Sequence, residues 1–93
     1  DADDQIGLVK QALKDLNLDE KRYRPYGLHA AISNAKNELR GPDDYPVQNY
    51  RDEVTRRVYQ QYQKLLLASN AVDFDDLLLY TAHLLETHPA ARE

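Results

Sequence analysis

Two groups of polar side chains have the types and spacing that could do chemistry. The first is the acidic triplet Asp73, Asp75 and Asp76, whose carboxylates could ligate a metal ion or act as an acid–base pair. The same residues also suit the first turn of a helix, where acidic groups interact favourably with unpaired backbone N–H groups. Asp73 followed three residues later by Asp76 resembles a capping box, with Asp for the usual Glu. We favour the helix start over a metal or catalytic site.

The second group is basic and polar and repeats at helical spacing. His29, Ser33, Lys36 and Arg40 fall on one face of a predicted helix over residues 27–39. Such a stripe could contact nucleic-acid phosphates, although a charged outer face is normal for any surface helix. The charge distribution adds a weak hint of phosphate contact. The chain carries a net charge of −4, yet residues 21–64 hold nine bases and five acids.

Known catalytic signatures are absent from the sequence. The three glycines are isolated and form no phosphate-binding loop, and the three histidines show no HExxH spacing. There is no cysteine, which excludes disulfides and thiolate ligands and fits a reducing cytoplasm. We therefore predict no catalytic residue and no metal site in this chain. The longest apolar runs, residues 65–68 and 77–80, are far too short to cross a bilayer, so no membrane contact is expected.

The elements that must position these residues are predicted to be helices. Apolar residues recur at helical spacing over about 4–16, 27–39, 49–68 and 73–87, with a short helical turn within 42–48. No strand pattern appears. The expected fold is all-α, a compact bundle of four to five helices that forms a single helical domain over residues 1–93.

Three features favour a piece of a larger protein. The sequence has no methionine, and residues 88–93 have the pattern of a turn followed by a helix start. In the predicted last helix, residues 77–80 are consecutive apolar residues, and Leu84 and Leu85 follow. These cover most of the helix circumference, so the helix needs burial on more than one side. Something outside this chain is expected to cover it.

The tyrosines could in principle stack on bases, but most are expected to pack. Four lie on or beside apolar stripes and are predicted to be core residues: Tyr50, Tyr59, Tyr62 and Tyr80. Tyr23, Tyr26 and Tyr45 lie in predicted connectors and are freer, although packing over helix ends is favoured for them too.

Four segments resemble the UvrD/PcrA/Rep superfamily 1 DNA helicases, in the same order and at the right distances. Residues 32–39 are similar to that family's IS-x-AKNEL segment and residues 58–63 to its VY-x-x-YQ helix. Residues 70–78 match its N-x-x-DFDDLL segment, and residues 4–16 look like the helix that opens its accessory subdomain 1B. The resemblance covers the whole chain and identifies it as similar to subdomain 1B.

The resemblance implies a DNA-facing role. Such helicases are ATP-driven 3′–5′ motors in DNA repair and replication, and subdomain 1B lies beside duplex or junction DNA. It implies phosphate contact by Lys36 and Asn37 of the AKN segment, and more weakly by Arg40, Ser33 and His29. These contacts would be independent of base sequence. Alone, the chain is expected to bind DNA at around 10⁻⁴ M or more weakly.

The resemblance also implies what the chain lacks. ATP and Mg²⁺ would be bound by other subdomains of the parent helicase, so this chain should hold no cofactor and have no ATPase activity. Its last helix would dock on the motor through Phe74, Leu77, Leu78 and Leu85, and Asp73, Asp75 and Asp76 would be capping and interface residues. The alternative is a helical protein-interaction module whose Leu77–Leu85 surface grips an unrelated partner.

Overall fold

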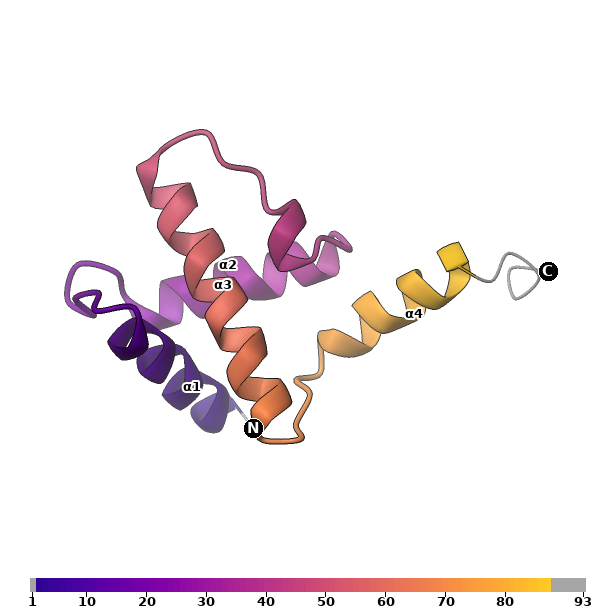
Figure 1. The fold of residues 1–93 in the computed structure, drawn as a ribbon, viewed down its shortest axis with the longest axis horizontal. Helices are drawn as coiled ribbons and strands as arrows, with labels where there is room; N and C mark the ends of the chain where they lie inside the picture. Colours follow the sequence, from indigo (N-terminus) through magenta and orange to yellow (C-terminus); the bar gives the residue numbers. More distant parts are fainter. Residues whose placement is uncertain (1, 88–93) are drawn as a thin grey trace.

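The computed structural model describes residues 2–87, which form helices joined by short connections (Figure 1). The elements in chain order are α1 (Ala2–Asp15), α2 (Pro25–Asn37), the 3₁₀ helix η1 (Pro42–Asp44), α3 (Tyr50–Ala68) and α4 (Asp76–Thr87). No strand occurs within residues 2–87. The all-α prediction of four to five helices is confirmed. The turn and helix start predicted over 88–93 lie outside the described residues.

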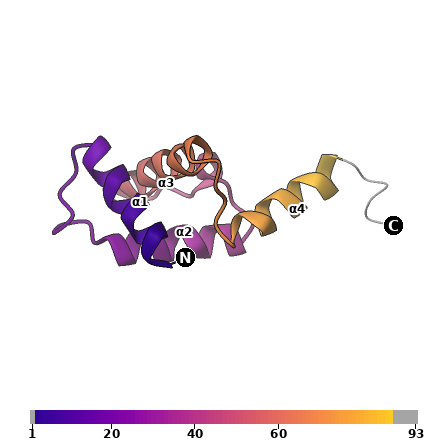
Figure 2. The same cartoon turned by 90° about the horizontal axis from the view of Figure 1, so that it is seen from below.

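Helices α1, α2 and α3 pack together and form what we call the body. Figures 1 and 2 show α3 lying across α2, with α1 beside both. One apolar stripe from each helix meets at the centre, because residues three and four apart share a helix face. Burial of these side chains is the main favourable contribution to folding. The core comprises these side chains together with Tyr23 of the α1–α2 connector: Val9, Ala12, Leu13, Tyr23, Leu28, Ile32, Ala35, Val54, Val58, Tyr59, Tyr62 and Leu66.

Helix α4 leaves the body and extends away from it (Figures 1 and 2). In the described part of the chain, its backbone approaches α2 and no other helix. The predicted start at residue 73 is three residues early, because residues 74–75 form a turn before the first helical residue. Within residues 2–87, no helix is both long enough and apolar enough to cross a membrane.

The tyrosines only partly follow the sequence prediction. Tyr59 and Tyr62 are fully buried, as expected. The expectation for Tyr50 and Tyr80 is wrong, since they are 63% and 55% exposed. Tyr50 lies in the first turn of α3, and Tyr80 lies on α4, which only α2 approaches within residues 2–87. Helical spacing identifies an apolar face, but it does not say whether a partner covers that face.

Candidate functional site

Lys36, the residue best placed by sequence for phosphate contact, is buried. Its side chain is 0% exposed. The ammonium lies 2.6 Å from Asp73 Oδ2 and 2.7 Å from Asp76 Oδ1. A phosphate contact by this ammonium would require both ion pairs to break and two buried carboxylates to lose their counter-charge. The prediction is therefore corrected: in this structure Lys36 joins α2 to the segment that begins α4.

Every carboxylate oxygen of Asp73 and Asp76 has a partner. Asp73 Oδ2 also accepts a hydrogen bond from Tyr62 Oη at 2.9 Å, and Asp76 Oδ1 accepts one from Gln63 Nε2 at 3.0 Å. The remaining oxygens accept reciprocal backbone N–H bonds, from Asp76 to Asp73 at 2.8 Å and from Asp73 to Asp76 at 2.9 Å. The predicted capping box is confirmed. We call Lys36, Asp73, Asp76 and Tyr62 the buried ion cluster.

The buried ion cluster is electrically unbalanced, with one ammonium facing two carboxylates. Two tyrosine rings add to the stabilisation of the cation, because Lys36 Nζ lies 5.2 Å from the ring centroid of Tyr62 and 5.9 Å from that of Tyr59. Burial, and then the nearby charge of Asp73, raises the pKa of the Tyr62 hydroxyl far above its ordinary value. The cluster therefore holds Tyr62 in its neutral, hydrogen-bond-donating form.

The structure also explains the acidic triplet without a metal ion. The Lys36 ammonium occupies the space between the carboxylates of Asp73 and Asp76 that a cation would take. Asp75 accepts a hydrogen bond from Ser33 Oγ at 2.5 Å instead. No group of three or more acidic, histidine or cysteine side chains suited to a metal is found in residues 2–87.

Two further members of the predicted phosphate-binding face are also engaged within the chain. His29 Nε2 lies 2.6 Å from Gln5 Oε1 of α1, and Ser33 bonds to Asp75. Asn37 and Arg40 are exposed. The face predicted for DNA therefore divides in two. His29, Ser33 and Lys36 hold neighbouring segments, and Asn37 and Arg40 are exposed at the C-terminal end of α2.

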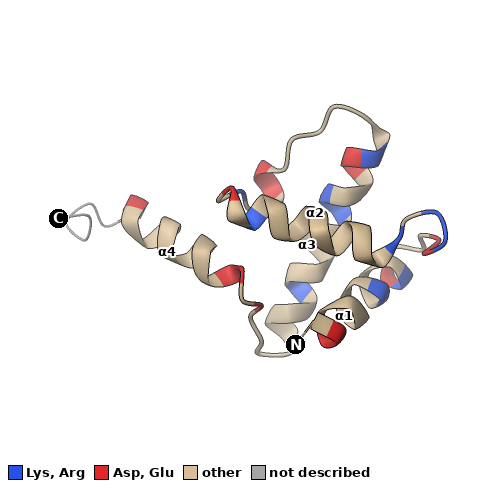
Figure 3. Ribbon diagram, turned by 180° about the vertical axis from the view of Figure 1, so that it is seen from behind, with Lys and Arg blue, Asp and Glu red and all other residues tan. Residues whose placement is uncertain are grey.

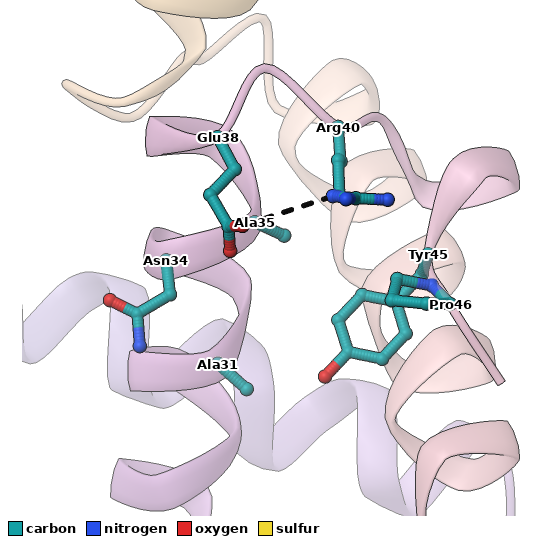
Figure 4. A pocket seen from close by; sticks show the side chains of 7 residues that line it. All are labelled: Ala31, Asn34, Ala35, Glu38, Arg40, Tyr45 and Pro46. Atoms are coloured by element: carbon teal, nitrogen blue, oxygen red, sulfur yellow. Dashed lines mark ion pairs between the residues drawn. The ribbon is translucent and has the colours of Figure 1, made fainter. Parts of the chain in front are cut away.

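Arg40 borders a cavity of about 270 Å³ between α2 and the loop that follows it (Figure 4). Tyr45 and Pro46 line one wall, and Asn34 and Glu38 project from α2. Arg40 Nε lies 4.0 Å from Glu38 Oε2, and both side chains are about half exposed or more. The nearby carboxylate partly offsets the guanidinium charge, so this surface attracts phosphate less strongly than an isolated arginine would.

One signal in the sequence does indicate that Lys36 is buried. Lys36 follows Ile32 by four residues and Leu28 by eight, which places it at the edge of the apolar stripe of α2. A lysine in that position needs a buried counter-charge, because an unpaired buried ammonium is very costly. The DFDD segment supplies two carboxylates, although no local pattern shows that the segments meet.

The residues predicted to dock on a motor lie at the surface of the turn and α4. Phe74, Leu77 and Leu78 are 78%, 53% and 40% exposed, and Leu85 is partly buried. Tyr80 and Leu84 extend the apolar surface, each more than half exposed. We call Phe74, Leu77, Leu78, Tyr80 and Leu84 the α4 apolar surface. Contiguous exposed apolar side chains of this kind mark interaction surfaces.

The helical body, the buried ion cluster and the α4 apolar surface describe a small all-helical unit with an exposed apolar surface. Residues 1–93 match the UvrD/REP helicase N-terminal domain, and the chain belongs to this family. The ATP-dependent DNA helicase PcrA of Bacillus subtilis strain 168 is 40% identical over 95 residues, covering 100% of this chain and 13% of that helicase.

Other relatives agree. PcrA helicases of Staphylococcus epidermidis strain RP62A and Staphylococcus aureus strain Mu50 are each 39% identical, again covering 100% of this chain and 13% of the relative. This chain therefore spans only 13% of the length of these relatives. No solved structure matches it.

Proposed function

We propose that this chain is a DNA-facing accessory subdomain, of the 1B type, of an ATP-dependent 3′–5′ DNA helicase. The observation that carries the proposal is the 40% identity to a PcrA helicase across the entire chain. In the parent protein, ATP and Mg²⁺ would be held by other subdomains, and the enzyme would act on cytoplasmic DNA in repair or replication. This chain would contribute contacts to duplex or junction DNA without reading base sequence.

Of the residues that the sequence predicts for DNA contact, those at the C-terminal end of α2 are still exposed. Asn37 and Arg40 can donate hydrogen bonds to phosphate oxygens, whereas Lys36, Ser33 and His29 are engaged within the chain. The last three residues support the contact indirectly, by fixing α2 against α1 and against the segment that begins α4. Lys36 would thus position the DNA-facing helix and not bind phosphate itself.

The α4 apolar surface would dock on the remaining subdomains of the helicase. Helix α4 has a single neighbour in the described residues, and residues 2–87 do not cover its exposed leucines. A parent protein whose relatives are several times longer offers that cover. An unrelated protein partner for the Leu77–Leu85 surface is the alternative, because the same exposed side chains would serve it.

An NMR titration of the ¹⁵N-labelled chain with a short duplex carrying a 3′ single-stranded tail tests the proposed DNA contact. We expect amide shifts that fade as salt is raised, because phosphate contacts release counterions. Substitution of both exposed residues, Asn37→Ala with Arg40→Ala, tests the end of α2 separately. Absence of any shift at millimolar DNA would contradict direct DNA contact by this chain.

A further inference from the structure

A groove of about 570 Å³ lies between α1 and the connector that leads into α2. Three cations line it, Lys10 from α1 together with Lys21 and Arg24 from the connector, and Glu20 is the one acid in its lining. Figure 3 shows the basic stretch of this connector and the basic residues on the adjoining half of α1. The groove lies at the end of α2 opposite to Asn37, so the two surfaces can be tested separately.

The three cations of the groove are available to a ligand. Within residues 2–87, none of them forms an ion pair, whereas Lys36 is held by two buried carboxylates and Arg56 lies 2.6 Å from Glu53. All three are exposed. Exposed, unpaired lysine and arginine side chains gathered around one depression are what binding to a phosphodiester backbone requires. The positive N-terminal end of the α2 dipole strengthens the same field.

The connector is held in place before any ligand arrives. The Asp19 carboxylate accepts a hydrogen bond from the Lys21 backbone N–H at 2.9 Å. Tyr23 is 7% exposed and belongs to the core, and the Arg22 guanidinium lies 5.7 Å from its ring centroid. A ligand would therefore meet Lys21 and Arg24 on an ordered segment, which lowers the entropy that binding must overcome.

Tyr26 distinguishes this groove from a simple basic patch. It lines the groove in the first turn of α2, and 69% of its surface is exposed. An aromatic ring beside cations is the arrangement that holds single-stranded nucleic acid, because an unpaired base can stack on the ring. A duplex keeps its bases stacked inside. An acidic peptide could satisfy the cations, but its carboxylates offer no planar base for Tyr26.

We propose that this groove binds an unpaired nucleic-acid strand, with Lys10, Lys21 and Arg24 on its phosphates and Tyr26 stacked on a base. The inference rests on the proposed DNA-facing function and specifies the strand and the residues. It places a single-strand contact on a surface separate from the end of α2.

The experiment measures binding of the chain to a short fluorescent oligothymidylate and to a duplex of equal length, at low salt and over a salt series. The groove variant is Lys10→Ala/Lys21→Ala/Arg24→Ala. Its matched control, Lys14→Ala/Arg51→Ala/Lys64→Ala, removes three exposed cations outside the groove. Circular dichroism checks that each variant is folded. Tyr26→Ala tests stacking, and an oligoglutamate is used as competitor.

We expect the groove variant to weaken oligothymidylate binding by about tenfold or more beyond the control, and to reduce the salt slope by about two. Tyr26→Ala should weaken binding of oligothymidylate by about 5- to 150-fold and leave duplex binding unchanged. Equal losses for the two triple variants would overturn the groove. Two outcomes would show that the ligand of the groove is not an unpaired strand. One is that Tyr26→Ala leaves oligothymidylate binding unchanged, and the other is that oligoglutamate of equal charge displaces oligothymidylate.

The inference and the function on which it rests can fail separately. Binding that is lost in Asn37→Ala/Arg40→Ala but kept in the groove variant would overturn the groove and retain the DNA-facing function. If the unaltered chain binds neither oligothymidylate nor duplex at low salt, direct DNA contact by this chain fails, and the groove fails with it.

Discussion

The body and α4 bury their residues in opposite ways. In the body, apolar side chains such as Leu13 and Leu28 are 1% exposed, and α1, α2 and α3 each contribute to one core. In α4, Leu77 and Leu84 are more than half exposed, and Asp76 is the one buried residue of the helix. The body is therefore held by apolar burial, whereas α4 is attached mainly through a charged group at its first residue.

This difference gives the two regions different roles. Apolar burial is non-directional and stabilises the body as a unit. The buried ion cluster is directional, because Lys36 Nζ must reach Asp73 and Asp76 at the same time. It fixes where α4 leaves the body and leaves the apolar face of that helix uncovered. Both properties would suit the proposed accessory subdomain, which would join the rest of a helicase at a defined angle.

Removal of Lys36 should have the largest effect on the chain. Lys36→Ala leaves Asp73 and Asp76 buried without a counter-charge, and loss of one partner from a buried ion pair costs about 3–5 kcal/mol. We expect that loss in the free energy of unfolding from urea titration followed by circular dichroism. Lys64→Ala, at an exposed position, is the control and should change stability by less than about 0.5 kcal/mol. A similar small loss for Lys36→Ala would show that the cluster does not stabilise the fold.

Truncation of one leucine in each region tests the contrast directly. Leu28→Ala removes a side chain that is 1% exposed, so it should lower the free energy of unfolding by about 2–5 kcal/mol. Leu77 is 53% exposed, and Leu77→Ala should cost about 0.5 kcal/mol or less. The same urea titration measures both. Comparable losses would mean that α4 is packed as tightly as the body.

Tyr62→Phe tests the polar part of the cluster. It keeps the buried ring but removes the hydrogen bond to Asp73, and a bond to a charged group contributes about 1.5–3 kcal/mol. In the double variant Tyr62→Phe/Asp73→Asn, an amide replaces the carboxylate that has lost its hydrogen-bond donor. This change should not recover the lost stability, because Lys36 then also loses a counter-charge. Recovery of stability in the double variant would show that the loss in Tyr62→Phe comes from the carboxylate left without its donor, and not from the missing hydrogen bond itself.

The same tyrosines predict how stability depends on alkaline pH. Burial raises the pKa values of Tyr59 and Tyr62 in the folded chain above the ordinary value of 10.0. As pH rises through that ordinary value, the unfolded chain loses these protons while the folded chain keeps them. The contribution of these two tyrosines to the free energy of unfolding should therefore be constant below pH 10 and fall as pH rises above it. Urea titrations at a series of alkaline pH values should show a smaller fall for Tyr62→Phe.

Local patterns in the sequence predict the helices and the capping box of Asp73 and Asp76, because helical spacing and helix-start signals act over a few residues. They also predict that α4 has surplus apolar surface. They do not predict the partner of Lys36, which lies 37 residues further along the chain. That pairing depends on the tertiary placement of α2 beside the start of α4. The same limit explains Tyr50, which lies in the first turn of α3 at the exposed end of a buried stripe, and Tyr80, which lies on a helix that only α2 approaches within residues 2–87.

The smallest effect is expected where the body meets α4. Leu39 follows the C-cap residue of α2 with a φ of 62°, in the left-handed region that costs a residue with a side chain about 1–2 kcal/mol. Leu39→Gly should relieve most of this strain and raise the free energy of unfolding by about 0.5–1 kcal/mol. Asn70→Gly, at a φ of 52°, is the control and should gain less, because asparagine tolerates this conformation.

Leu39 also lines a cavity with Leu79 and Tyr80 of α4, so its side chain is one of the few apolar groups between the two regions. If the ion cluster alone holds α4, Leu39→Gly should leave the hydrogen-exchange protection of α4 unchanged while it stabilises the body. A fall in α4 protection together with a loss of overall stability would show that the Leu39 contact outweighs the backbone strain. Helix α4 would then be attached by apolar packing as well as by charge.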